Sequence, residues 1–153
     1  MPGSIHAFVI VDPEILGLED SEFEIGEKIY IGKEGRTKVQ SVLGKLDFEQ
    51  ISDSAQSEIP GVVESIIIKN EKRFVDYLNN AQSLTPRIHA LELIPSIGKT
   101  HMNVLIQERE KKPFESFSDI ENRTRLKEPM KHISKRILEE ISGETRMNLF
   151  VKR

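Results

Sequence analysis

A tight turn in the second half of the chain, residues 95–98, carries the clearest chemical signal in the sequence. It joins two helical patterns, so it directs unpaired backbone N–H groups and the positive end of a helix dipole outwards, an arrangement that favours an anion. The glycine of the turn lets a phosphate approach the main chain, and the lysine that follows adds a positive charge. The residues that we expect to contact nucleic-acid phosphates are Ser96, Ile97, Gly98, Lys99, Thr100 and His101.

Signals of catalysis are missing from the sequence. It contains neither a G-x-x-x-x-G-K-[ST] phosphate loop nor a G-x-S-x-G nucleophile turn, and it has no cysteine. Its four histidines form no H-x-x-x-H pair and are His6, His89, His101 and His132. We therefore expect a protein that is not an enzyme, with no catalytic residue, metal site or cofactor.

Charge is distributed unevenly along the 153 residues, whose formal net charge is -3. Residues 1–70 hold 6 Lys and Arg against 13 Asp and Glu, a net -7, whereas residues 71–153 hold 16 against 12, a net +4. A polyanion is therefore attracted to the second half of the chain. The acidic first half is suited to a protein partner or, as the alternative, to single-stranded RNA.

No apolar run approaches the roughly 20 residues that cross a bilayer. The short apolar run at the N-terminus lacks a basic flank and a small-residue cleavage site, so it does not resemble a signal peptide. We expect a cytoplasmic protein that has no membrane partner.

Helical periodicity begins after residue 52. Apolar residues mark one or two helices over 63–78 with a break near Asn70, and Thr85-Pro86 has the composition of a helix start. A further helical pattern runs from the turn to Pro113. The spacing of Ser116 and Asp119, like that of Ser118 and Glu121, is typical of a capping box, and Pro129 and Gly143 bound the last helix.

Residues 1–52 have the pattern of β-strands. A continuous apolar run over 8–11, alternation around Ile29 and Ile31, and a stretch over 38–51 that includes Phe48 predict three strands. The low aromatic content, 6%, and the acidic character favour a core position for Phe48 and solvent exposure for the nearby lysines over a base-stacking surface.

The segment 91–106 resembles the helix-hairpin-helix motif, in which G-h-G joins two helices and h is apolar. Ile97 and Gly98 match its last two positions, and Ser96 stands at the first glycine. The resemblance extends to the helix-hairpin-helix segment of DNA-uptake competence proteins, in which an arginine, Pro-Phe and Ser-x-x-Asp follow, here Arg109, 113–114 and 116–119. The second hairpin of those proteins is degenerate or absent here, because residues 121–129 contain no G-h-G.

The chain as a whole resembles the archaeal domain-of-unknown-function family six-fifty-five. The resemblance is carried by residues 74–75, 79–81, 84–95, 113–117 and 136–137. It implies an α+β chain in two parts, an OB-like β-barrel (1–52) followed by an all-α, SAM-like helix-hairpin-helix domain (53–153). The hairpin is expected at 85–112 and a short terminal strand at 147–151. The resemblance also implies RNA or nucleotide binding.

These observations together predict a protein that binds the backbone of RNA or DNA without reading the base sequence, with RNA favoured. Part of the basic stretch after the hairpin is a candidate flank of the phosphate track, and its members are Lys111, Lys112, Arg123, Arg125, Lys127, Lys131, Lys135 and Arg136. The alternative is a protein-interaction adaptor in which the hairpin serves only to fold the chain.

Overall fold

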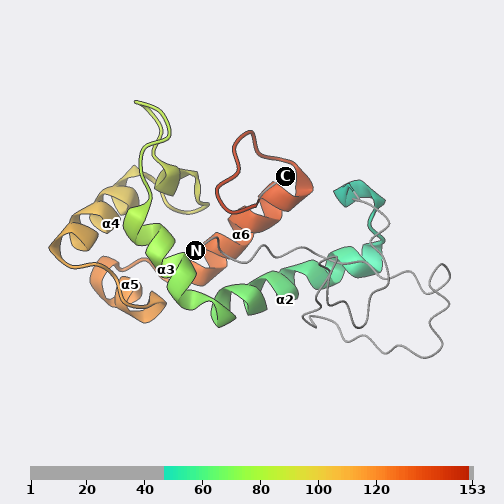
Figure 1. The fold of residues 1–153 in the computed structure, drawn as a ribbon, viewed down its shortest axis with the longest axis horizontal. Helices are drawn as coiled ribbons and strands as arrows, with labels where there is room; N and C mark the ends of the chain where they lie inside the picture. Colours follow the sequence, from blue (N-terminus) through green and yellow to red (C-terminus); the bar gives the residue numbers. More distant parts are fainter. Residues whose placement is uncertain (1–46, 152–153) are drawn as a thin grey trace, which may run out of the picture. The chain divides into compact units, whose positions relative to one another are not determined.

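The computed structural model describes residues 47–151, which are drawn in colour in Figure 1. The chain divides into two compact units, residues 1–58 and 59–153, and each is described by itself. The described part of the first unit contains a 3-10 helix, η1 (Phe48–Gln50), and the start of α2 (Asp53–Lys69).

The prediction of an α+β fold with an OB-like barrel is wrong. Over residues 47–151 the structure has helices and no strand. At the end of the expected strand 38–51, the backbone N–H of Gln50 donates to the carbonyl of Asp47 at 2.9 Å, and the Gln50 side chain accepts from the Asp47 N–H at 2.8 Å. These short-range bonds favour a helical turn over a strand. Phe48 is half-buried and not a core residue, and residues 1–46 lie outside the described part of the chain.

The second unit starts within α2 and continues, after Asn70, in α3 (Glu71–Asn80). The predicted break at Asn70 is therefore confirmed. The Asn70 side-chain amide donates to the carbonyl of Ile66 at 2.8 Å, so it binds the C-terminal end of α2 where the chain turns. Four of the five apolar residues that predicted these helices are buried, and Ile66 is half-buried; the buried four are Val63, Ile67, Phe74 and Leu78.

The helix predicted to start at Thr85-Pro86 is replaced by a projecting loop and a short 3-10 helix, η2 (Ala90–Leu93). The Thr85 hydroxyl accepts from the backbone N–H of Ile88 at 3.0 Å and from that of Arg87 at 3.3 Å. The Thr85 hydroxyl, whose chemistry would also suit a helix cap, therefore closes a turn.

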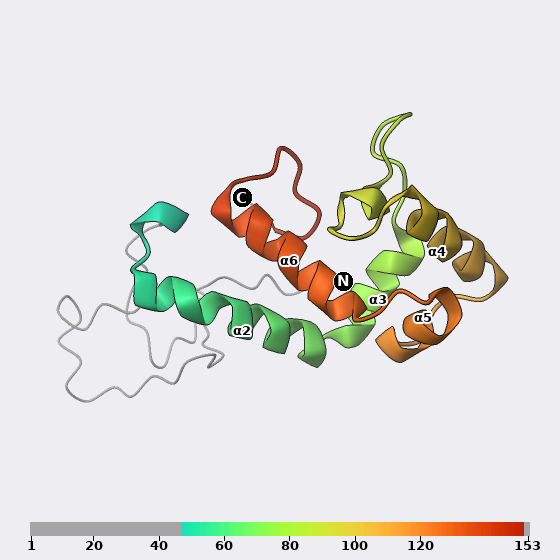
Figure 2. The ribbon, with the colours of Figure 1, turned by 180° about the vertical axis from the view of Figure 1, so that it is seen from behind.

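Three further helices complete the unit: α4 (Lys99–Lys111), α5 (Phe117–Thr124) and α6 (Pro129–Ser142). Within it, α4 packs against η2 and α5, and α5 packs against α6 (Figures 1 and 2). The predicted bounds of α6 are confirmed, because Pro129 occupies its first turn and Gly143 ends it with φ 82°. The core includes the fully buried side chains of Leu91, Ile94, Leu105, Ile120 and Ile133.

The terminal strand predicted at 147–151 is absent from the structure. The backbone N–H groups of Leu149, Phe150 and Val151 donate at 2.9–3.0 Å to the carboxylate of Glu140 on α6. A strand needs the backbone of another strand as its partner, and here a side chain takes that place. No helix among the described residues has the length and apolar character needed to cross a membrane.

Candidate nucleic-acid interface

The turn between η2 and α4 contains a serine in a backbone conformation that favours glycine. Ser96 has φ 69°, in the left-handed region, and the backbone N–H of Ile97 closes the turn by donating to the carbonyl of Ile94 at 3.1 Å. Ile97 is 4% exposed, so its side chain is buried in the core. The structure therefore gives Ser96 the positive φ and Ile97 the buried position that the motif requires, but the short helix η2 stands where the motif's first helix was expected.

Gly98 is the N-cap of α4 and faces open space. It is exposed, and a Cβ atom built on it meets no atom within 4 Å. No side chain caps this end of the helix, and its first turn contains no acidic residue. The helix has an ordinary start, since the carbonyl of Gly98 accepts from the N–H of Met102 at 2.9 Å. The first-turn N–H groups of α4 are therefore accessible to an external acceptor.

The six predicted contact residues lie on one continuous segment but differ in exposure. The side chains of Lys99 and Thr100 are exposed, and that of His101 is half-buried. Lys99 forms no ion pair within the described part of the chain, so its charge is available to a ligand. At this end of α4, a negative ligand gains from the helix dipole, the open N–H groups and one ammonium group.

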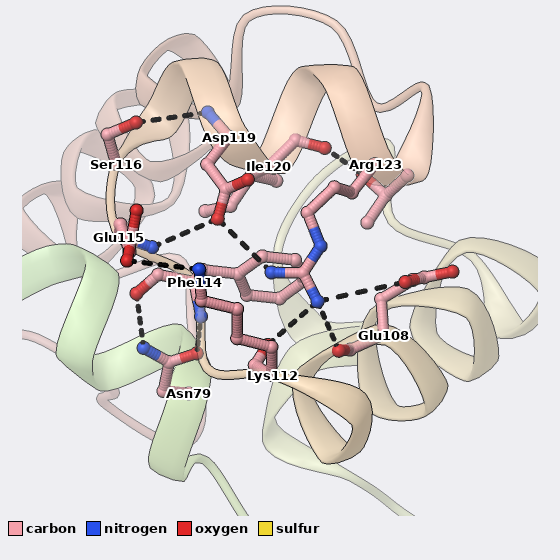
Figure 3. Close-up of polar contacts among 10 residues, drawn as sticks. Asn79, Glu108, Lys112, Phe114, Glu115, Ser116, Asp119, Ile120 and Arg123 are labelled. Carbon is pink, nitrogen blue, oxygen red and sulfur yellow. Dashed lines mark hydrogen bonds and ion pairs between the residues drawn. The ribbon is translucent and has the colours of Figure 1, made fainter.

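The residues that match the motif downstream of the turn serve the fold. Arg109 donates to the carbonyl of Leu78 at 3.0 Å, which ties α4 to α3, and burial lowers its pKa. The Ser116 hydroxyl caps α5 by accepting from the N–H of Asp119 at 3.0 Å, which confirms the predicted cap. Phe114 is buried, and the Asn79 side chain bonds both its N–H and its carbonyl, at 2.8 and 2.9 Å (Figure 3).

Arg123 closes the opposite end of α4. Its Nη2 atom donates to the carbonyls of Glu108 and Lys112 at 2.5 and 2.7 Å, and its Nη1 atom lies 3.1 Å from the Asp119 carboxylate. The guanidinium carbon lies 4.7 Å from the ring centroid of Phe114 (Figure 3). The positive charge therefore meets the negative end of the helix dipole. The sequence placed Arg123 only in a general basic stretch, because no local pattern indicates that its side chain bonds the carbonyls of Glu108 and Lys112.

The basic stretch is largely neutralised within the described part of the chain. Five of its eight members lie within 4 Å of a carboxylate, and they are Lys111, Lys112, Arg123, Lys131 and Arg136. The remaining three form no ion pair with a described residue, and they are Arg125, Lys127 and Lys135. Lys131 joins α6 to α2 through Glu64 at 3.2 Å. Most of these side chains therefore form ion pairs within the protein, and they do not form a continuous row of free positive charges along which a phosphate backbone could bind.

A second turn of similar form joins α5 to α6. Arg125 has φ 60° and is followed by Leu126, which is 3% exposed, as Ser96 is followed by the buried Ile97. The sequence offered no G-h-G here, and its only local signal is one apolar residue just before a helix start. This second turn is not open, because the carboxylate of Glu121 accepts from the N–H of Glu128 at 2.5 Å.

Two of the three histidines within the described residues, His89 and His132, have local partners. The Nδ1 atom of His89 accepts from the N–H of Leu91 at 3.0 Å and so caps η2, while burial and the charge of Arg109 lower its pKa. The Nε2 atom of His132 lies 2.9 Å from the carbonyl of Lys127. His6 lies outside the described residues.

Comparison with known proteins identifies relatives with no stated activity. The chain is 40% identical over 141 residues to "Uncharacterized protein MJ0038" of Methanocaldococcus jannaschii, a match that covers 91% of this chain and 64% of that protein's length. It is similar in structure to Af1531 of Archaeoglobus fulgidus, with a TM-score of 0.73 and 42% identity over 81% of this chain and 70% of that one. A family model described as "Protein of unknown function (DUF655)" matches residues 4–152, and the chain therefore belongs to this family.

Proposed function

We propose that this protein binds the sugar-phosphate backbone of nucleic acids, with RNA favoured over DNA, and does not read their base sequence. The contacts are the first-turn N–H groups of α4 and the side chain of Lys99. The observation that carries the proposal is the open helix start at Gly98, which has neither a capping side chain nor an acidic residue in its first turn. The preference for RNA rests on the family resemblance alone.

The charge distribution supports the same site. Residues 71–153 carry a net +4, and Lys99 has no carboxylate partner among the described residues. Phosphate contacts of this kind are electrostatic, so they release counterions and weaken as salt rises. Because the contacts are to backbone groups and not to base edges, one site serves many sequences.

Lys99→Glu tests the site directly. A carboxylate in the first turn of α4 suits the helix dipole, so the variant keeps its fold while its phosphate affinity falls. Lys69→Glu is the matched control, since it makes the same charge change at an exposed position that ends α2. We expect Lys99→Glu to lose at least tenfold in affinity for single-stranded RNA in a fluorescence anisotropy titration, and Lys69→Glu to lose much less.

A salt series and a panel of nucleic acids complete the experiment. For single strands the slope of log K against log salt is about -0.7 per phosphate contacted, and for duplex DNA about -0.9. Equal affinity of Lys99→Glu and the unchanged protein would exclude this turn as the binding site.

A protein-interaction adaptor is the second candidate. At the second turn, which contains Arg125, the carboxylate of Glu121 accepts from the N–H of Glu128, and this occupied N–H supports a reading in which such turns serve only to fold the chain. An adaptor predicts no nucleic-acid affinity at low salt in the same panel.

A further inference from the structure

A projecting loop precedes the candidate interface directly. Residues 82–89, called the finger from here on, leave the end of α3 and return into η2. In Figures 1 and 2 the finger is the yellow-green loop that extends beyond the helices. It has no acidic residue, and residues 82–87 are all exposed.

Hydrogen bonds hold the finger in one conformation. At its base the N–H of Ala90 donates to the carbonyl of Gln82 at 3.0 Å, and Ser83 pairs with His89 in an isolated antiparallel bridge. Nearer the tip the N–H of Leu84 donates to the carbonyl of Ile88 at 2.8 Å. The finger is therefore ordered before any ligand arrives, so binding costs little conformational entropy.

The tip of the finger presents two side chains of complementary chemistry. Leu84 is 44% exposed, and among the large apolar residues in the described part of the chain only Ile68, at 61%, is more exposed. Arg87 is exposed and forms no ion pair with any residue described by the structure. Pro86 between them restricts the backbone at the turn. An exposed apolar side chain and an unpaired guanidinium three residues apart on one loop suit a ligand that offers an apolar face near a negative charge.

The finger is joined to the candidate interface without a break. Its return arm continues through His89, the cap of η2, and η2 leads into the turn at Ser96. Four residues of 3-10 helix rise only about 8 Å. Along the chain, only η2 and the turn at Ser96 therefore separate the finger from Gly98, so the two lie on neighbouring segments.

We propose that the finger is a second nucleic-acid contact that selects single strands, an inference that rests on the proposed function. Leu84 packs against the face of an unpaired base, and Arg87 binds the adjacent phosphate. In a duplex the base faces are stacked on one another, so only a single strand offers both groups together.

The test compares the full chain with three finger variants on labelled single strands of about 12 nucleotides and on the corresponding duplexes. Leu84→Ala is expected to weaken single-strand binding about fivefold at every salt concentration, because apolar surface is no longer buried. Arg87→Ala is expected to reduce the salt slope by about 0.7, so that its loss of affinity is about threefold larger at about 50 mM salt than at about 200 mM. Ser83→Ala, an exposed change on the same finger, is the control and is expected to bind as the unchanged protein does.

A gain-of-affinity variant guards against loss through misfolding. Leu84→Phe gives the tip an aromatic face, so its affinity for single strands is expected to rise about fivefold or more while its duplex affinity stays unchanged. If Leu84→Ala, Arg87→Ala and Leu84→Phe all bind like Ser83→Ala while Lys99→Glu loses affinity, the finger is not a contact and the proposed function stands. A finger that contacts a protein instead gives this same result. If Lys99→Glu keeps full affinity, the proposed function fails, and with it this inference.

Discussion

The Nε atom of Arg136 lies 2.9 Å from Oε2 of Glu140, and both side chains are buried, at 7% and 0% exposure. The pair joins two distant parts of the chain, because Arg136 also donates to the carbonyls of Leu93 and Met147 at 3.2 and 2.6 Å. The Arg136 side chain thus connects α6 to η2 and to the C-terminal segment.

Glu140→Gln is expected to lower the free energy of unfolding by about 3–5 kcal/mol, because it leaves the buried Arg136 without its counter-charge. The new side-chain NH₂ group also faces N–H donors of residues 149–151. Urea denaturation measures the change, and hydrogen exchange shows earlier opening of those residues. Glu139→Gln, one position earlier, is the control and changes stability by no more than about 0.5 kcal/mol. Equal stability of the two variants would contradict this role of the pair.

Arg123→Lys is expected to destabilise the protein by about 1.5–3 kcal/mol although the charge is kept. A lysine cannot reproduce the planar fork that bonds the carbonyls of Glu108 and Lys112 and a carboxylate of α5 while it lies over Phe114. Thermal unfolding measures the loss. Arg125→Lys, at an exposed arginine with no ion pair among the described residues, is the comparison and should leave stability nearly unchanged. A similar effect of both changes would show that the fork geometry is unimportant.

Ser96→Gly is expected to raise the free energy of unfolding by about 0.5–1 kcal/mol. A non-glycine residue at φ 69° costs about 1–2 kcal/mol, and replacement by glycine removes this cost. The stabilisation is smaller than the cost removed, because glycine loses more backbone entropy on folding. Ser96→Val is expected to destabilise instead, because a β-branched residue fits this region poorly. Chemical denaturation of both variants provides the check, and the same sign for the two would refute the strain argument.

His89 predicts a fall in stability at acidic pH. Burial and the charge of Arg109 lower the pKa of His89 below 6.5, and its Nδ1 atom must be unprotonated to accept from the N–H of Leu91. The unfolded chain therefore binds a proton at a higher pH than the folded protein does. The stabilising contribution is present above about pH 6.5 and is lost as the pH falls towards the lower pKa of the folded state.

His89→Asn removes this part of the pH dependence and keeps a side-chain acceptor at the cap. The free energy of unfolding, measured between about pH 7.5 and 5, should fall more steeply for the unchanged protein than for the variant. Parallel curves would mean that His89 does not titrate in this way.

Local signals predicted the second half of the chain well. Proline at the first turn of α6, glycine at its end and the serine cap of α5 each act within a few residues, so their meaning does not depend on distant parts. The apolar spacing around Leu78 and Leu105 likewise marked the buried faces of α3 and α4 correctly. The turn at Ser96 was predicted for the same reason, because a buried apolar residue next to a small one is a local pattern.

Other features depended on contacts that the sequence does not display. Thr85 favours a helix start and a tight turn equally by its local chemistry, and only the pairing of Leu84 with Ile88 selects the turn. The apolar residues over 149–151 have strand-like character, but their N–H groups donate to the Glu140 carboxylate and are not available to pair with a strand.

The sequence by itself determined the break at Asn70, the serine cap of α5, the bounds of α6, the absence of cysteine chemistry and a turn with a glycine at a helix start. The tertiary structure alone decided that Gly98 is open while Glu121 closes the second turn, and that Arg109 and Arg123 serve the fold. The physical reason is that periodicity and capping are encoded over a few residues. Which charged side chain reaches which carbonyl depends on packing between helices that lie far apart in the chain.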